Sequence, residues 1–199
     1  MPVLTPRVAR VERTTRETTL TLDFTLDGTG RAEIATGIGF LDHLLAALAF
    51  HARFDVTLAC RGDLVVDDHH TAEDCAIAIG TAIDRALGDR AGITRFGHAY
   101  APLDEALARA VVDCSSRPFA RTELGLRRDQ IGALACENVG HVLNSLAINA
   151  RITLHVDVLA GENDHHRAEA AFKAVALALR AAVTRTADAG IPSTKGVLA

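Results

Sequence analysis

The chain has little of what several large classes of protein depend on. Its 199 residues include no tryptophan and one tyrosine, so aromatic platforms on which nucleic-acid bases could stack are scarce. Its net charge is -4, and no basic stripe is present to neutralise a phosphate backbone. No apolar run approaches the roughly 20 residues of a membrane span. We therefore expect neither nucleic acid nor a membrane among its partners.

Cysteine usage also excludes several possibilities. The four cysteines show no CxxC spacing, which argues against a zinc ribbon, and no charged and then apolar leader begins the sequence. A cytoplasmic location is therefore expected, where thiols stay reduced. Apolar residues make up 49% of the chain, enough for a sizeable core, which must consist mainly of alanine, leucine, valine and isoleucine.

What the sequence does contain is a repeat. HLLAALAFHAR, which begins at His43, matches HVLNSLAINAR, which begins at His141, at six of eleven positions. Further on, HHTAE from His69 matches HHRAE from His165, after 26 positions in the first half and 24 in the second. A bias toward alanine and leucine does not explain three matched histidines and a matched glutamate. We predict an internal duplication.

Hydrophobic periodicity predicts a similar order of elements in both halves. Alternating apolar residues indicate strands, and apolar residues at helical spacing indicate helices. For the first half the pattern predicts a hairpin with strands at 17–26 and from 31. A helix at 40–49, a strand at 54–60 and a helix at 72–87 follow it. For the second half it predicts strands at 105–114 and 117–124 and then a helix through His141. A strand at 152–158 and a helix at 166–186 complete this half.

These elements predict an α+β fold built by duplication of a β-β-α-β-(β)-α unit. Each half is expected to form a mostly antiparallel four-stranded sheet with two helices on one face. The optional strand is expected at residues 64–66. The joint is expected near 88–97, so the halves are predicted as 1–92 and 93–199 of one compact catalytic domain.

The matched segments also predict metal binding. In HHxAE, the glutamate follows the two histidines by four and three positions, so all three side chains can meet at the first turn of a helix. His43 and His141 are expected to add one further ligand per half. Several imidazoles with one carboxylate favour manganese, iron or zinc over thiolate chemistry. The candidates suffice for two sites of three histidines and one carboxylate: His43, His69, His70, Glu73, His141, His165, His166 and Glu169.

The other histidines and acids receive ordinary roles. His51, His98 and His155 lack repeat partners, and a lone buried histidine is usually a core residue with a satisfied hydrogen bond. Asp67 and Asp68 are expected either to orient imidazole N–H groups or to place negative charge at a helix N-terminus.

Two rival functions use the same metal ligands. In a structural protein the clusters would only join subunits, so metal removal would dissolve the assembly and nothing more. In a metallohydrolase a metal-activated water would be the nucleophile, so esters or amides would be turned over.

Over essentially its whole length the chain resembles imidazoleglycerol-phosphate dehydratases, the lyases of histidine biosynthesis. The matching stretches are RETTLTLDFTLDGTG, GIGFLDHLLAAL, GDLVVDDHHTAEDCAIAIGTA, GITRFG, APLDEAL, TLHVDVLAGENDHHRAEAAFKA and IPSTKGVL. The resemblance implies elimination of water from D-erythro-imidazole-glycerol phosphate, giving imidazole-acetol phosphate, at an active site with two Mn(II) ions. It also implies trimers that assemble into a homo-oligomer of 24 subunits, with metal sites between subunits.

The resemblance assigns the eight candidate ligands to manganese. It also assigns catalysis to Glu17 together with a subset of the ligands: His43, His70, Glu73, His166 and Glu169. Glu17 becomes the leading proton shuttle and a substrate-binding residue.

For the phosphate group of the substrate, the resemblance implies four residues. Arg95, Arg117, Ser193 and Lys195 match phosphate-binding positions, and guanidinium groups suit phosphate oxygens. The C-terminal STKG segment is expected to order when substrate binds. Ser116 departs from the family, which usually has glycine before the arginine. If the backbone there has positive φ, serine adds strain or shifts Arg117.

Overall fold

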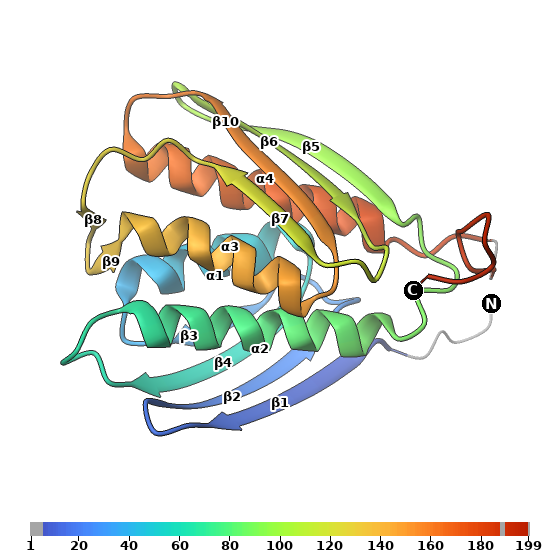
Figure 1. Ribbon diagram of the computed structural model, residues 1–199, viewed down its shortest axis with the longest axis horizontal. Helices are drawn as coiled ribbons and strands as arrows, with labels where there is room; N and C mark the ends of the chain where they lie inside the picture. The colour runs from blue at the N-terminus through green and yellow to red at the C-terminus, as the bar shows by residue number, and fades with distance from the viewer. Residues whose placement is uncertain (1–5, 188–189, 199) are drawn as a thin grey trace.

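The computed structural model describes residues 6–187 and 190–198, which form three layers (Figure 1). Two four-stranded sheets are the outer layers, and the long helices lie between them (Figure 1). Buried alanine, leucine, valine and isoleucine side chains dominate the core, as the composition predicts.

The first half contributes one sheet and two helices. Its elements are β1 (Val8–Thr14), β2 (Thr18–Thr25), β3 (Ala32–Ala35), α1 (Gly39–Ala52), β4 (Asp55–Gly62) and α2 (His69–Leu87). The strand order is β1-β2-β4-β3. Only β3 and β4 pair in parallel, and the other pairs are antiparallel.

The second half has the same arrangement. Its elements are β5 (Phe96–Leu103), β6 (Ala106–Asp113), β7 (Phe119–Glu123), the short β8 (Gln130–Ile131) and β9 (Leu134–Ala135), α3 (Cys136–Asn149), β10 (Thr153–Ala160) and α4 (Asp164–Val183). The order β5-β6-β10-β7 corresponds strand by strand to the first sheet, and only β7 and β10 pair in parallel. The predicted duplicated α+β fold is confirmed, while the boundary between residues 92 and 93 stays a prediction.

One predicted strand is wrong. Residues 64–66 form a turn, closed by a hydrogen bond from the amide of Val66 to the carbonyl of Asp63. The side chain of Val65 is almost fully exposed because no strand lies beside it. The fourth strand of the first sheet is β1 instead.

The strands β1 and β5 lie outside the sequence-based prediction for a common physical reason. Both are edge strands, and few large apolar side chains point inward from them. Val11 is the buried residue of β1, and the buried residues of β5 are Gly97 and Ala101. Small buried residues produce no alternation of hydrophobicity, although such a strand still pairs through its backbone.

The helix ends follow local signals. Gly88 ends α2 with φ of 58°, in the left-handed region that glycine tolerates, as predicted. The helix α4 begins at Asp164 rather than near 166, because the side chain of Asn163 accepts a hydrogen bond from the amide of His165. The first turns of α2 and α4 lie at the same end of the molecule (Figure 1).

The helices pack in pairs drawn from different halves. The helix α1 contacts α4, and α2 contacts α3. A side chain on one half can therefore meet a side chain on the other across each helix pair. Among the described residues, no helix is long and apolar enough to cross a membrane.

The close approach of β5 to α4 predicts a stability effect. A Cβ at Gly97 would overlap the carbonyl oxygen of Ala178 and lie 2.7 Å from the amide nitrogen of Ala182. Gly97→Ala should lower the free energy of unfolding by about 1–3 kcal/mol through overpacking, measured by denaturant titration. Gly39→Ala is the control, because nothing lies within 4 Å of its Cβ position. Unchanged stability of the Gly97 variant would contradict this packing.

Candidate metal centres

Histidine and glutamate side chains of α1 and α4 form the first of two compact groups. Nε2 of His43 lies 2.8 Å from Oε2 of Glu169, and Nε2 of His165 lies 3.2 Å from the same oxygen. One ligand atom from each of the three residues can be chosen so that all lie within 4.8 Å of one another. The ring of Phe40 packs beside both imidazoles. We call His43, His165 and Glu169 the His43 cluster.

A matching group joins α2 to α3. Nε2 of His141 lies 3.1 Å from Oε1 of Glu73, and the rings of His69 and His141 stack with their centroids 4.8 Å apart. Nδ1 of His69 contacts Oδ1 of Asn138 at 3.0 Å, which fixes the orientation of that ring. We call His69, Glu73 and His141 the His141 cluster, and its ligand atoms also lie within 4.8 Å of one another.

The two halves exchange their lone histidines. His43 comes from the first half but joins His165 and Glu169 of the second, whereas His141 of the second half joins the first-half pair His69 and Glu73. The sequence predicts one such further ligand per half but not which ligands share an ion, and the structure adds each lone histidine to the pair of the opposite half. The cause is the packing of α1 on α4 and of α2 on α3.

The second histidine of each adjacent pair lies outside its cluster. The rings of His69 and His70 are 6.0 Å apart at 78°, and those of His165 and His166 are 6.1 Å apart at 89°. Consecutive residues of a helix point about 100° apart, so both cannot face the same neighbouring helix. Within one chain each cluster thus holds two histidines and one glutamate, and sites of three histidines and one carboxylate stay a prediction.

His70 has carboxylates of its own. Its Nδ1 lies 3.1 Å from Oδ2 of Asp63, and its Nε2 lies 3.7 Å from Oε1 of Glu17. The hydrogen bond with Asp63, followed by the charge of Glu17, raises the pKa of His70. Glu17 also lines an open cavity of about 400 Å³.

His166 is held in a similar way in the second half. Its Nδ1 lies 2.7 Å from Oε2 of Glu105, and this hydrogen bond raises the pKa of His166. The backbone amide of Asn163, the His166 ring and the amide of Glu162 lower the pKa of Glu105 to about 2.

Asp63 and Glu105 are missing from the sequence-based prediction, which gave the orienting role to other acids. Asp67 accepts a hydrogen bond from the amide of His69, and Asp68 accepts one from the amide of Ala135. Of the two roles expected for these acids, the structure supports negative charge at a helix N-terminus. Asp67 contacts the amide of the first residue of α2, and Asp68 is the N-cap residue of that helix.

Lys173 is a further charged residue that the sequence-based prediction missed. It follows Glu169 by one helical turn, and its Nζ lies 2.6 Å from Oε1 of Glu169. Burial alone would raise the pKa of Glu169, but Lys173 and His43 together lower it to about 2. Glu169 is therefore a carboxylate anion at neutral pH. The i,i+4 spacing of Glu169 and Lys173 was the available signal.

Both clusters fit a divalent first-row cation. Such ions bind nitrogen and oxygen ligands at about 2.0–2.2 Å, so the ligands of one ion lie within roughly 4.4 Å of one another. Both clusters are close to that size, and two imidazoles with a carboxylate are suitable donors for manganese, iron or zinc. The His43 cluster would hold one ion and the His141 cluster a second.

The predicted phosphate-binding residues lie near the C-terminal end of α4, away from the two clusters. Arg95 donates from Nε to Oδ1 of Asp113 at 2.7 Å and from Nη1 to the carbonyl of Pro192 at 2.8 Å. Nη2 of Arg117 lies 3.5 Å from Asp113. The amide of Lys195 donates to Oγ of Ser193 at 3.2 Å. Because Pro192 directly precedes Ser193, its hydrogen bond with Arg95 places the start of the STKG segment close to Arg95.

Ser116 adopts the conformation that glycine favours. Its φ is 63°, in the left-handed region where side chains other than those of glycine, asparagine and aspartate are uncommon. The condition under which serine adds strain before Arg117 is therefore met.

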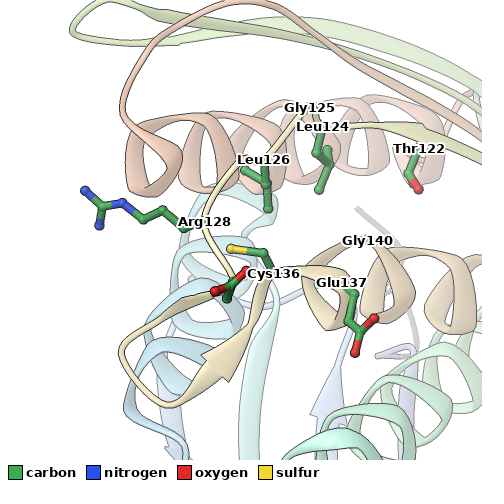
Figure 2. A pocket seen from close by; sticks show the side chains of 9 residues that line it. Thr122, Leu124, Gly125, Leu126, Arg128, Cys136, Glu137 and Gly140 are labelled. Atoms are coloured by element: carbon green, nitrogen blue, oxygen red, sulfur yellow. The ribbon is translucent and has the colours of Figure 1, made fainter.

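A separate cavity of about 530 Å³ lies between β7, the loop after it and α3 (Figure 2). It is lined by Thr122, Leu124, Gly125, Leu126, Arg128, Asp129, Cys136, Glu137 and Gly140. None of the predicted site residues lines it. The two clusters are therefore the stronger candidate for the functional site.

Comparison with known proteins agrees with this fold and site. A sequence model of the imidazoleglycerol-phosphate dehydratase family matches residues 36–179. The chain is 54% identical to the imidazoleglycerol-phosphate dehydratase of Salinibacter ruber, over 100% of this chain and 98% of that protein. It is 58% identical to the Phytophthora nicotianae protein of the same name over 97% of this chain, although it spans only 43% of that longer relative.

Solved structures give the same result. The crystal structure of the Pyrococcus furiosus enzyme in complex with (S)-C348 superposes with a TM-score of 0.82 at 37% identity, over 94% of this chain and 100% of that one. The Staphylococcus aureus enzyme superposes with a TM-score of 0.81 at 36% identity, over 90% and 99%.

Fold and site define a duplicated α+β protein in which the halves exchange histidines to build two similar histidine and glutamate clusters. The chain belongs to the imidazoleglycerol-phosphate dehydratase family. Members of this family are dehydratases of histidine biosynthesis, and this chain is an enzyme of that kind.

Proposed function

We propose that the chain dehydrates D-erythro-imidazole-glycerol phosphate to imidazole-acetol phosphate, with two Mn(II) ions per active site. The observation that carries the proposal is the presence of both clusters in a chain of this family. The proposed ligands are the two clusters and the second histidines of the adjacent pairs, His70 and His166.

The reaction explains why cations are needed. The proton to be removed lies on a side-chain carbon beside the imidazole ring, where no carbonyl delocalises the resulting charge. When bound, two divalent ions supply the positive charge that stabilises the substrate ring as an imidazolate. The remaining tasks, which are proton transfer, orientation and phosphate binding, belong to side chains of the protein.

Glu17 is suited to the proton transfer. Its side chain is 51% exposed and lies 3.7 Å from Nε2 of His70, so it stands beside a proposed ligand without belonging to either cluster. The carboxylate is accessible both to substrate and to water. It can therefore accept a proton from the substrate carbon and return one to the departing hydroxyl group.

Phosphate binding requires a second chain. The amide of Arg95 donates to the carbonyl of Ala182 near the end of α4, whereas His165 lies in the first turn. The intervening 17 residues of helix span about 26 Å. The substrate, with carbon–carbon bonds of about 1.5 Å, is no longer than roughly 10 Å. One chain therefore cannot supply both groups to one substrate.

The proposed solution is an active site between subunits. In this arrangement the end of one chain that carries Arg117 and Lys195, both exposed, meets the end of another chain that carries the clusters. The proposal includes trimers assembled into a 24-subunit particle. A cytoplasmic location fits the biosynthetic family and the four free, buried cysteines.

The C-terminal segment is proposed to close over the phosphate. Truncation after Pro192 retains the carbonyl that binds Arg95 but removes Ser193 and Lys195. It should lower kcat/KM by at least about tenfold, mostly through KM, because charge-assisted hydrogen bonds to phosphate are lost. Steady-state kinetics of the truncated and full chains test this, and full activity without the segment would refute its role.

The direct test of the function is an assay for imidazole-acetol phosphate after manganese reconstitution, with and without chelator. The proposal predicts product only with metal. A purely structural role for the clusters predicts that chelation disperses the assembly and that no dehydration occurs under any condition. A metallohydrolase predicts turnover of esters or amides instead.

A further inference from the structure

The two histidines outside the clusters are oriented alike. Nδ1 of His70 faces Asp63 at 3.1 Å and 3.2 Å from its two oxygens, and Nδ1 of His166 faces Glu105 at 2.7 Å. The same ring nitrogen is bound in both halves. The Nε2 atom of each ring is left to face other groups.

The two carboxylates come from different places in the repeat. Asp63 follows β4, whereas Glu105 directly precedes β6. The first-half residue that corresponds to Glu105 is Glu17, which directly precedes β2. Glu17 faces Nε2 of His70 rather than Nδ1. After duplication, equivalent glutamates thus face different ring nitrogens.

A carboxylate at Nδ1 decides which nitrogen can bind a metal. A neutral imidazole carries one N–H, and a carboxylate that accepts it keeps the proton on Nδ1. The lone pair is then on Nε2, and the bound ring cannot rotate freely.

We propose that Asp63 and Glu105 are positioning residues that hold His70 and His166 in the Nδ1–H tautomer and present Nε2 to a divalent cation. The inference rests on the proposed function, because it takes His70 and His166 as manganese ligands. It adds two residues that act through those ligands and do not themselves touch metal or substrate.

A substitution of Glu105 can test the tautomer of His166 directly. Its Oε1 accepts hydrogen bonds from the amides of Glu162 and Asn163 at 3.1 and 2.8 Å, and its Oε2 faces His166. In Glu105→Gln the amide oxygen stays with the two backbone N–H groups, so the new NH₂ group faces Nδ1. A donor there favours the opposite tautomer, in which Nε2 carries the proton and cannot bind metal.

Asp63 should respond differently. Both of its oxygens lie near the same Nδ1 atom. In Asp63→Asn the side chain can turn its remaining oxygen to the ring and preserve the tautomer. Asp63→Ala removes the acceptor entirely.

The test is Mn(II) titration of the full-length protein in competition with a chelator. Glu105→Gln and Asp63→Ala should each weaken one class of site by about 10- to 100-fold, whereas Asp63→Asn should change it far less. Glu123→Gln, an exposed glutamate of β7, is the matched control and should titrate like the parent chain. The melting temperature of each variant without metal should change little, because the glutamine of Glu105→Gln can keep both backbone hydrogen bonds and a partly exposed ion pair contributes little to stability.

Two outcomes would overturn the inference. One is parental manganese affinity in both Glu105→Gln and Asp63→Ala. The other is a large fall in the melting temperature without metal in each variant that loses manganese affinity. That result would indicate a merely structural role for the two carboxylates. Failure of the proposed function looks different, since the parent chain itself would then bind no manganese or form no imidazole-acetol phosphate.

Discussion

Replacing Glu17 with glutamine should lower the dehydratase turnover of the manganese-loaded protein by about 100- to 10,000-fold, the usual contribution of a positioned acid or base. An amide cannot accept the substrate proton. Glu17 belongs to neither cluster, so manganese content and the size of the assembly should stay unchanged. Steady-state assay, metal analysis and sedimentation of the same preparation measure the three quantities.

The matched control for this substitution is Glu12→Gln. Glu12 is an exposed residue of β1 in the same sheet, paired with Arg10 on the surface, and it should have normal turnover. Near-normal turnover in the Glu17 variant would contradict its assignment as the proton shuttle. A loss of metal together with activity would instead make Glu17 part of the metal site.

His43→Asn should reduce the manganese content from two ions per chain to one. The structure places His43 with His165 and Glu169 of the opposite half, so the ion lost is that of the His43 cluster. The His141 cluster, which shares no residue with it, should keep its ion. Turnover should fall close to background, because the proposed chemistry requires both cations.

Metal analysis by mass spectrometry, combined with a crystal structure of the variant, would locate the remaining ion. His155→Asn is the control, since His155 lies on β10 beside Phe119 and belongs to neither cluster. This variant should bind two ions per chain. Retention of both ions in the His43 variant would contradict the exchanged clusters.

The duplication can be predicted from the sequence because the same metal-binding residue types recur at matching positions in both halves. Matched histidines and a matched glutamate indicate two equivalent halves whatever their structure, and long amphipathic helices such as α2 repeat their apolar residues clearly. The edge strands β1 and β5 escape prediction because Val11, Gly97 and Ala101 are too few or too small to produce a hydrophobic pattern. Residues 64–66 are apolar but have no neighbouring strand.

The site was predictable only in part. The i,i+4 spacing correctly joins His69 with Glu73 and His165 with Glu169, and helical geometry alone could have separated His70 and His166 from them. The exchange of His43 and His141 depends on which helices pack together, which residue spacing along the chain does not specify. The distance between Arg95 and the clusters likewise depends on the tertiary structure, because Arg95 packs at one end of α4 and His165 lies in the first turn at the other end.

The most direct test is anomalous diffraction at the manganese edge from crystals of the loaded protein. The account predicts two anomalous peaks per chain, one within bonding distance of His43, His165 and Glu169 and the other within bonding distance of His69, Glu73 and His141. Crystals of catalytically active protein with no manganese at either cluster would contradict it.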